Sequence, residues 1–263
     1  MLKMKNVTYV YEDGTVALDN VNIDLNINQR IGIVGSNGAG KSTVFMNFLG
    51  LLKPARGKIY YKEEELSYNK KALTELRKNV GIVFQDPDKQ IFFSNVYDDI
   101  AFALRNLKYD EKEIKERVEA SMEKTNISHL KNKPVHFLSY GQKKNVSIAS
   151  TIAMNQKLIF FDEPTSGLDR DSRENIKNIL NSLVEKENKS IVVSSHDMNF
   201  IYEVCDYIYV LNKGHVLSEG ESKYVFLNKK ILDEASLEEP FLVKVHKYLG
   251  KPLYKNEKDL FEN

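Results

Sequence analysis

The chain has 263 residues, of which 42% are hydrophobic, enough for one large α/β domain or for a domain with a smaller insert. Its 38 Lys and Arg residues balance 37 Asp and Glu, so the net charge does not favour nucleic acid or an anionic membrane as the main partner. The absence of a signal-like apolar N-terminus and of apolar runs near 20 residues predicts a soluble protein, or one peripheral on a membrane. The only cysteine, Cys205, excludes an internal disulfide and fits a reducing cytoplasm.

The first part of the chain has the pattern of antiparallel strands. Residues 1–30 alternate apolar and polar side chains in short runs, and Asp13-Gly14 between two of these runs is typical of a turn. Residues 31–34 are apolar throughout, which predicts a short buried strand. Residues 44–52 continue as a helix that ends before Pro54 and Gly57.

The segment between the buried strand and this helix matches the pattern G-x-x-x-x-G-K-[ST] at every fixed position. Its glycines allow a tight loop whose N–H groups point at phosphate oxygens, and the helix N-terminus adds a positive dipole end. A nucleoside triphosphate is therefore expected here, with Lys41 reaching the β- and γ-phosphates and the Ser42 hydroxyl holding Mg²⁺. The predicted loop consists of Gly35, Ser36, Asn37, Gly38, Ala39, Gly40, Lys41, Ser42 and Thr43.

Two further apolar strands end in polar residues. Residues 80–84 end at Gln85, and residues 158–161 end at Asp162 and Glu163. In a doubly wound sheet these strand ends lie at the edge that binds phosphate, so Asp162 can join the Mg²⁺ shell. A carboxylate bound to a metal is a poor proton acceptor, and we therefore assign the attacking water to Glu163. Without the phosphate loop, Asp162-Glu163 would be read as a solvated pair after a strand.

The middle and end of the chain are predicted to be largely helical. Residues 94–106, residues 110–125 and a helix after Ser139 form a helical insert at about 90–155. The strand pair at 207–211 and 215–219 flanks the hairpin signal Asn212-Lys213-Gly214. The last thirty or so residues are predicted to be helical, with one apolar side formed by Phe241, Val245, Tyr248 and Leu249.

The start of the helix after Ser139 is a second site suited to phosphate. Ser139 is a good N-cap, Gly141 allows close approach to the backbone, and Gln142 follows in the first turn. One nucleotide in one phosphate loop has little use for a second such site, so we expect this one to reach the nucleotide of a second copy. Taken alone, Ser-Tyr-Gly-Gln is an ordinary helix cap, and His196 taken alone is more often structural than catalytic.

Together these segments resemble the ATP-binding subunits of ABC transporters over nearly the whole chain. The similarity lies in six motifs in the family's order: Walker A at 35–43, the Q-loop at Gln85, the signature at 138–142, Walker B at 160–163, the D-loop at 166–169 and the switch histidine at His196. It implies an α/β P-loop NTPase core with an N-terminal antiparallel β subdomain and a helical insert. The ABC ATPase domain would span residues 1–230, with a C-terminal helical tail at 231–263.

The resemblance also implies roles for individual residues. Catalytic roles fall to Lys41, Gln85, Glu163 and His196, and the Mg²⁺ shell to Ser42, Gln85 and Asp162. ATP would lie between the Walker motifs of one subunit and the signature and D-loop residues of another in a head-to-tail dimer. Besides the phosphate loop, the residues expected to contact ATP are Tyr11, which would stack on adenine, and Ser139, Gly141, Gln142 and Asp169.

Two positions depart from the family pattern. Tyr140 replaces the usual first glycine of the signature, and Asn145 stands where relatives commonly carry Arg. Neither change removes a group that does chemistry. Because Glu163 and His196 are both present, the sequence argues against a site that has lost hydrolysis.

Within the family, residues 84–92 and the tail segment 237–242 resemble the energy-coupling-factor group, which imports vitamins or transition-metal ions. Residues 136–144 and 195–197 favour its cobalt or nickel branch, with a vitamin as the alternative. The resemblance implies integral membrane partners for coupling and substrate binding, a second ATPase subunit, no nucleic acid, and a place on the cytoplasmic face of the cell membrane. A regulatory ATPase acting on a soluble partner is the alternative of another class. Residues 85–93 are expected to form the coupling surface.

Overall fold

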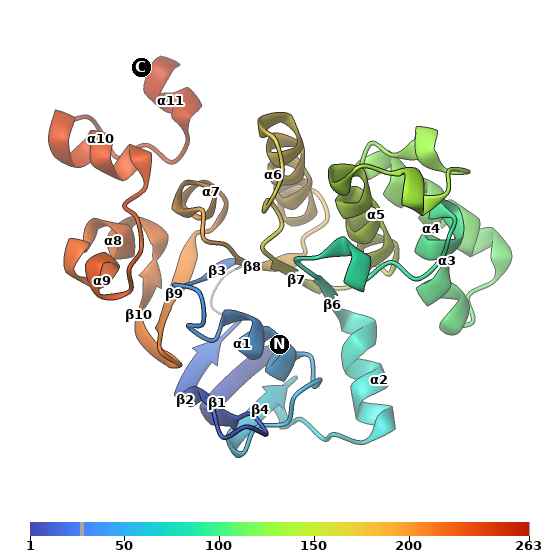
Figure 1. Cartoon of the computed structure of the whole chain (residues 1–263), viewed down its shortest axis with the longest axis horizontal. Coiled ribbons are helices and arrows are strands. Elements are labelled where there is room, and N and C mark those ends of the chain that lie inside the picture. The colour runs from blue at the N-terminus through green and yellow to red at the C-terminus, as the bar shows by residue number, and fades with distance from the viewer. Residues whose placement is uncertain (27–28, 263) are drawn as a thin grey trace. The chain divides into compact units, whose positions relative to one another are not determined.

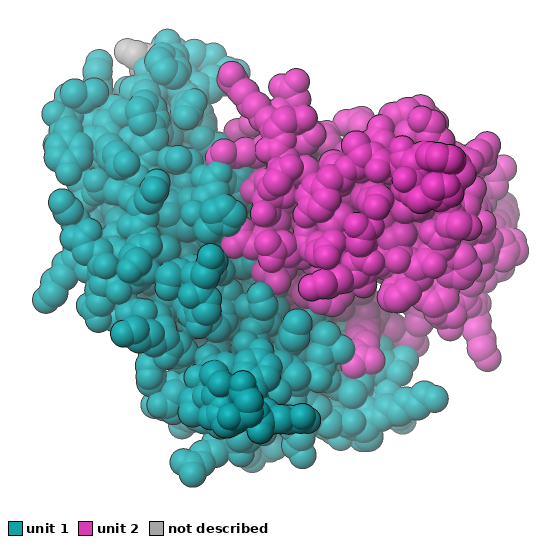
Figure 2. Space-filling model, in the orientation of Figure 1, with its two compact units in different colours: residues 1–76, 192–263 teal, residues 77–191 magenta. Residues whose placement is uncertain are grey.

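The computed structural model describes residues 1–26 and 29–262. The chain divides into two compact units, residues 1–76 with 192–263 and residues 77–191 (Figure 2). Strand β8 (Ser190–Ser194) and helix α2 (Lys70–Asn79) each contain a point at which the chain passes from one unit to the other. The two units are described in turn.

The first unit contains the antiparallel sheet that the alternating pattern predicts (Figure 1). Its strand β1 buries Leu2 and Met4, which are two residues apart and so share one side of the sheet, and also buries Val7, which follows an irregularity in the pairing with β2. The strand order is β2-β1-β4-β5, with β1 at Leu2–Val10, β2 at Val16–Asp24, β4 at Arg56–Tyr61 and β5 at Glu64–Glu65. The predicted antiparallel subdomain is confirmed.

The same unit contains three strands of the nucleotide-binding type of sheet. Strand β3 (Arg30–Val34) pairs in parallel with β9 (Tyr207–Asn212), and β9 pairs antiparallel with β10 (His215–Glu221). Lys213 and Gly214 have φ values of 46° and 81°, the left-handed conformation that a two-residue hairpin turn requires. The predicted hairpin and the predicted buried strand at 31–34 are therefore confirmed.

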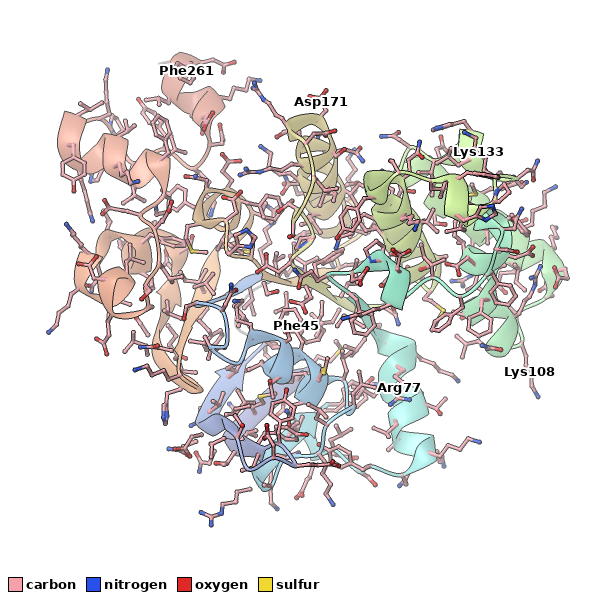
Figure 3. The ribbon with its side chains drawn as sticks, viewed as in Figure 1. Phe45, Arg77, Lys108, Lys133, Asp171 and Phe261 are labelled. Carbon is pink, nitrogen blue, oxygen red and sulfur yellow. The ribbon has the colours of Figure 1, made fainter. Side chains whose placement is uncertain are left out.

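Helix α1 (Lys41–Phe48) ends earlier than the sequence pattern suggests. The prediction of helix through residue 52 is wrong because the chain turns at Gly50, whose φ is +64°. A Cβ at that glycine would lie only 2.5 Å from the side chain of Leu73, so the sharp turn also makes room for α2. Phe45, labelled in Figure 3, is completely buried on α1.

The remaining helices of this unit follow β8 and β10 in the chain. They are α7 at Met198–Val204, α8 at Ser222–Leu227, α9 at Lys229–Glu234, α10 at Phe241–Leu249 and α11 at Glu257–Glu262. Parts of the tail are helical, but of the four residues on the predicted apolar side of α10 only Val245 is buried. Leu242, Val243 and Val245 are buried, whereas Tyr248 and Leu249 are exposed, because α10 packs on α8 through the adjoining face.

The second unit contains two parallel strands and four of the described α-helices. Strands β6 (Val80–Val83) and β7 (Leu158–Asp162) pair in parallel, and all five residues of β7 are buried. Such a run of apolar residues is typical of a strand that is covered on both faces. The predicted strands are confirmed, with Phe84 lying just beyond the end of β6. Helix α6 (Arg170–Glu185) begins near Asp171, labelled in Figure 3.

Three helices of this unit share one hydrophobic core, and they are the predicted helical insert (Figure 1). They are α3 at Val96–Asn106, α4 at Glu111–Lys124 and α5 at Tyr140–Ala153, with short 3₁₀ turns at Pro87–Lys89, Ser128–Leu130 and Val135–Phe137. Asn95, Asp110 and Ser139 each cap one helix by accepting a hydrogen bond from a backbone N–H of its first turn. Leu104, Ile114 and Val118 are completely buried in the shared core.

Replacing Leu104 by Ala is expected to lower the free energy of unfolding by roughly 2–5 kcal/mol, because it leaves a cavity in this core. Leu249→Ala is the matched control, since Leu249 is 71% exposed, and it is expected to change stability by less than about 0.5 kcal/mol. Urea denaturation followed by circular dichroism measures both. Equal midpoints for the two variants would contradict the packing of α3 described above.

Candidate functional site

The phosphate loop of the first unit closes only because two of its residues lack side chains. A Cβ at Gly35 would lie 2.5 Å from the carbonyl oxygen of Leu211, and a Cβ at Gly40 would lie 2.8 Å from that of Ala17. Gly40, with a φ of +105°, is the N-cap of α1. Any other residue at these positions would push the loop away from its neighbours, so the glycines fix where its N–H groups lie.

The β9–β10 hairpin holds this loop from outside. The Gly214 N–H at its turn donates to the carbonyl of Ala39 (N···O 3.1 Å), and the Gly214 carbonyl accepts from the N–H of Asp19 (N···O 2.9 Å). The sequence predicted the hairpin but not this contact, which joins segments far apart in the chain. The motif thus has a rigid support contributed by the late part of the chain.

Lys41 is folded over the loop that it follows. Its Nζ donates to the carbonyls of Gly35 at 2.8 Å and Ser36 at 3.2 Å, and the residue is only 8% exposed. The ammonium group therefore lies at the centre of the loop, where it can attract phosphate oxygens. Ser42 and Thr43 lie in the first turn of α1, beside the helix N-terminus that also attracts anions.

Tyr11 is attached to the start of the same helix. Its phenolic oxygen lies 2.9 Å from Oγ1 of Thr43, and its ring is 40% exposed and makes an edge contact with Tyr9. The hydroxyl bond places one aromatic ring beside the phosphate loop with part of its surface open. That arrangement is compatible with the predicted stacking on adenine.

His196 follows β8 in the same unit and is exposed. The next residue, Asp197, caps α7 by accepting the N–H of Phe200, and its own N–H donates to Oγ of Ser195 at 3.0 Å. These bonds define the backbone on both sides of the histidine. The imidazole therefore projects from a fixed turn between a buried strand and a helix.

In the second unit, the carboxylates of Asp162 and Glu163 stand where β7 ends. Both residues are largely buried, with exposures of 8% and 6%. Glu163 has a φ of +45°, a left-handed conformation that is costly for a residue with a long side chain. The chain therefore turns sharply just after the strand.

The end of the neighbouring strand β6 is fixed by a glutamine that the sequence analysis did not single out. Oε1 of Gln90 accepts the N–H of Phe84 at 3.0 Å, and its Nε2 donates to the carbonyl of Ser147 on α5 at 2.9 Å. Gln85, the predicted sensor, follows Phe84 and has an exposed side chain. The sequence gives little indication that Gln90 has this structural role, because an amide side chain in a polar turn is usually solvated.

A second residue missed from the sequence is Lys144 on α5, which is fully buried. Its Nζ donates to the carbonyls of Gln85 at 2.7 Å, Phe84 at 3.0 Å and Glu163 at 3.4 Å. Burial lowers the pKa of its ammonium group to about 8, although the nearby carboxylates of Asp162 and Glu163 act in the opposite direction. One side chain thus joins the signature helix to the ends of β6 and β7.

The helix start at residues 139–142 has the predicted geometry. Ser139 accepts the N–H of Gln142, and the Gln142 side chain accepts the N–H of Ser139, which together form a capping box. A Cβ at Gly141 would meet only ordinary contacts of 3.5 Å with Leu168 and Ser172. Asp169 caps α6 by accepting the N–H of Ser172, and this bond lowers the pKa of its carboxyl.

Each unit thus brings together its own share of the predicted residues. The first unit contains Tyr11, the phosphate loop and His196, and the second contains Gln85, Ser139, Gly141, Gln142, Asp162, Glu163 and Asp169. A hydroxyl from Ser42, a carboxylate from Asp162 and an amide oxygen from Gln85 are hard oxygen donors. Their chemistry suits Mg²⁺ and does not suit a soft metal.

Comparisons with known proteins place this geometry in context. The family model described as ABC transporter matches residues 18–166. A Listeria monocytogenes protein named as an ABC transporter ATP-binding protein is 48% identical over 99% of this chain and 97% of its own length. The cobalt import ATP-binding protein CbiO of Salmonella paratyphi A is 40% identical over 99% of this chain and 96% of its own. The energy-coupling factor transporter ATP-binding protein EcfA2 of Clostridium perfringens is also 40% identical, over 91% of this chain and 84% of its own.

Solved structures of ABC transporter ATP-binding proteins are similar to this chain over most of its length. The structure of cbiO1 from Clostridium perfringens, described as part of the ABC transporter complex cbiONQ, has a TM-score of 0.80 and 37% identity, covering 100% of this chain and 98% of that one. The dimeric ATP-binding cassette MJ0796 bound to ADP and Pi has a TM-score of 0.77 and 30% identity, covering 84% of this chain and 99% of that one.

Lys144→Met is expected to lower the free energy of unfolding by roughly 2 kcal/mol, because three carbonyl groups lose a shared donor at a buried site. The matched control is Lys143→Met, which removes a surface pair with Asp88 (Nζ···Oδ1 2.7 Å) and should cost less than about 1 kcal/mol. Urea denaturation at pH 7 compares the two. A larger loss for Lys143→Met would show that the buried lysine does not hold the strand ends.

Proposed function

Because this chain belongs to the ABC transporter family, we propose that it is the ATPase subunit of an energy-coupling-factor importer that takes up Co²⁺ or Ni²⁺. Its ABC domain binds ATP, and ABC subunits of this kind are ATPases coupled to transport. The observation that carries the proposal is the phosphate loop with Lys41 at its centre, followed in the chain by a buried carboxylate pair at the end of β7.

ATP binding follows from the loop in the first unit. The N–H groups between Gly35 and Thr43 and the N-terminus of α1 hold the phosphates, and Lys41 adds a positive charge that the loop carbonyls keep in place. Tyr11 stacks on the base, because the bond of its hydroxyl to Thr43 fixes the ring beside the helix. In this scheme the phosphates are held by the loop and Lys41, whereas the base is held by ring stacking, which depends little on the identity of the base.

Hydrolysis is assigned to the residues that the family motifs mark. Ser42, Asp162 and Gln85 would hold Mg²⁺, which supplies charge neutralisation at the β- and γ-phosphates when bound. Glu163 orients the attacking water and accepts its proton, and its buried position after β7 keeps it apart from solvent. His196 contacts the γ-phosphate from the turn after β8 and senses whether it is present.

The signature helix acts on a second ATPase subunit in this proposal. The capped start of α5 presents backbone N–H groups next to Gly141, where a side chain would not obstruct a phosphate. The dimeric form reported for the MJ0796 cassette supports a two-subunit site of this kind. Each nucleotide would then contact Lys41 of one subunit and Ser139 of the other.

The surface that couples the chain to membrane subunits lies in residues 85–93. Phe92 is 75% exposed, and it packs with Phe93 against the ring of Phe102 on α3. Buried Asp99 holds this segment by accepting the N–H of Phe92 at 2.8 Å and of Phe93 at 3.0 Å. Aromatic side chains on a fixed backbone are typical of a protein interface.

Membrane partners are part of the proposal because relatives of this chain are named as ATP-binding subunits of transporters. Among the helices that the structure describes, none has the length and apolar character needed to cross a bilayer. We place the subunit on the cytoplasmic face of the membrane, bound to a coupling subunit and a substrate-binding subunit. The cobalt import name of one relative supports a metal cargo, and the energy-coupling factor name of another is compatible with a vitamin.

Replacing Glu163 by Gln is expected to preserve ATP binding while lowering kcat at least 100-fold, on the order of the loss of a general base. Lys41→Ala should instead weaken ATP binding itself, because it removes the charge at the centre of the loop. Equilibrium binding of a fluorescent ATP analogue and phosphate release measure the two effects. Hydrolysis by Glu163→Gln at the wild-type rate would show that another group, with His196 as first candidate, is the base.

Phe92→Asp should uncouple transport while sparing basal ATPase activity, since it places a charge on the exposed coupling surface and leaves the site residues unchanged. Phe261→Asp, at a residue that is 78% exposed on α11 (Figure 3), is the matched control. The assay compares ATP hydrolysis by the isolated chain with uptake in cells that also produce the membrane subunits. Normal uptake with Phe92→Asp would place the coupling surface elsewhere.

Uptake of labelled cobalt and nickel by cells expressing this chain with its membrane partners tests the cargo. We expect metal accumulation that requires Lys41 and Glu163. A panel of labelled vitamins serves as the comparison. Vitamin accumulation without metal uptake would replace the cargo assignment and leave the ATPase mechanism intact, and activity on a soluble partner alone would favour a regulatory ATPase.

A further inference from the structure

Tyr140 occupies a position for which the phosphate-binding role of the helix start gives no explanation. It is the first residue of α5, and its hydroxyl donates to the carbonyl of Gln85 (O···O 3.1 Å). The same carbonyl accepts from Nζ of Lys144 at 2.7 Å, one helical turn further along α5. Two donors on one helix therefore converge on one backbone oxygen at the end of β6.

The ring of Tyr140 makes a second contact, with the turn that follows β7. A Cβ built on Gly167 would lie 3.4 Å from Cε1 of the ring, so ring and glycine are in close contact. Gly167 has a φ of +74°, and the turn is continuous with the cap of α6 at Asp169. The ring thus lies between the start of α5 and a turn that an ordinary residue would adopt with strain.

The phenol is a hydrogen-bond donor at this site. Partial burial and the carboxylates of Asp86 and Asp88 raise its pKa above the usual value, so it stays protonated at neutral pH. A protonated hydroxyl has one proton to donate, and the carbonyl of Gln85 is the acceptor that it reaches. The bond is therefore directional and fixes the rotation of the ring.

We propose that Tyr140 is a positioning residue that ties the start of α5 to the Gln85 strand end and to the Gly167 turn. This inference rests on the proposed function, in which Ser139 and Gly141 contact the nucleotide of a second subunit while Gln85 senses the nucleotide of its own. This hydrogen bond keeps the start of α5 and the Gln85 strand end of one subunit at a fixed position relative to each other. The approach of the α5 start to the nucleotide of the second subunit then depends on whether the subunit's own site, sensed by Gln85, holds ATP.

The hydroxyl can be removed without exposing an unsatisfied group. In Tyr140→Phe the carbonyl of Gln85 keeps its bond to Lys144, and the ring keeps its contact with Gly167. Only the link between the ring and the strand end is lost. Tyr140→Ala removes the ring as well, so the two variants separate the contribution of the hydroxyl from that of the ring.

The test compares wild type, Tyr140→Phe, Tyr140→Ala and the control Tyr224→Phe, whose ring on α8 is 61% exposed. Steady-state ATP hydrolysis is measured per site that binds a fluorescent ATP analogue, so that a smaller folded fraction does not lower the apparent kcat. Hydrogen exchange of residues 84–90 is measured on the same proteins. The melting temperature identifies any general loss of stability.

Tyr140→Phe is expected to lower kcat per binding site by roughly 2- to 10-fold, the effect of one net hydrogen bond, with little change in KM for ATP. Exchange at residues 84–90 should become faster, while Tyr224→Phe behaves as wild type. Unchanged kcat and exchange in Tyr140→Phe would overturn the proposal. So would full activity of Tyr140→Phe with loss in Tyr140→Ala, because the ring alone would then act.

Failure of the proposed ATPase function and failure of the Tyr140 role give different results in this test. If wild type and Tyr140→Phe both fail to hydrolyse ATP, the proposed ATPase function fails, whereas the exchange measurement still reports on the tie. If wild type hydrolyses ATP and Tyr140→Phe matches it in kcat and exchange, only the positioning role fails.

Discussion

The binding of phosphate by backbone N–H groups is the constraint on which the rest of the first unit depends. It requires the chain to turn at Gly35 and Gly40 where any Cβ would collide with carbonyl oxygens of β9 and β2. It also requires a support behind the loop, which the Gly214 turn of the β9–β10 hairpin provides through the carbonyl of Ala39. The antiparallel sheet contributes Tyr11 next to the same helix start. These features explain why segments near residues 11, 40 and 214 converge on one short loop.

In the second unit, the ends of two parallel strands are held in place by one buried lysine side chain. Parallel strands end at the same edge, so β6 and β7 deliver Gln85 and the Asp162-Glu163 pair there. Backbone carbonyl groups at these strand ends need hydrogen-bond donors, and the buried Lys144 on α5 donates to three of them. The cost of burying its charge is offset by these bonds and by the neighbouring carboxylates. In this way the helix that carries the signature is bonded to the strand ends that carry the proposed catalytic residues.

Local rules in the sequence were sufficient for much of this arrangement. The phosphate loop, the Lys213-Gly214 turn, the cap at Ser139 and the fully buried β7 each depend on residues close in the chain, and each was predicted. The failures depend on tertiary contacts. Helix α1 ends at Phe48 and the chain turns at Gly50, where a Cβ would collide with Leu73. The buried side of α10 is set by its packing on α8, and Lys144 is buried where two strand ends offer carbonyl groups. A lysine five residues after a helix cap carries no sequence signal for burial. The catalytic roles of the site residues are predictions from the sequence motifs, and the geometry within each unit is compatible with these roles.

Sedimentation velocity of the full chain carrying Glu163→Gln, with ATP and Mg²⁺, tests most directly whether two copies complete each nucleotide site. In the proposed site the nucleotide contacts Lys41 of one copy and the start of α5 in the other, so ATP should favour the closed pair by mass action. We expect a monomer without nucleotide and with ADP, and a dimer with ATP. A monomer with ATP, at concentrations where the chain binds ATP, would contradict a site built from two copies of this chain.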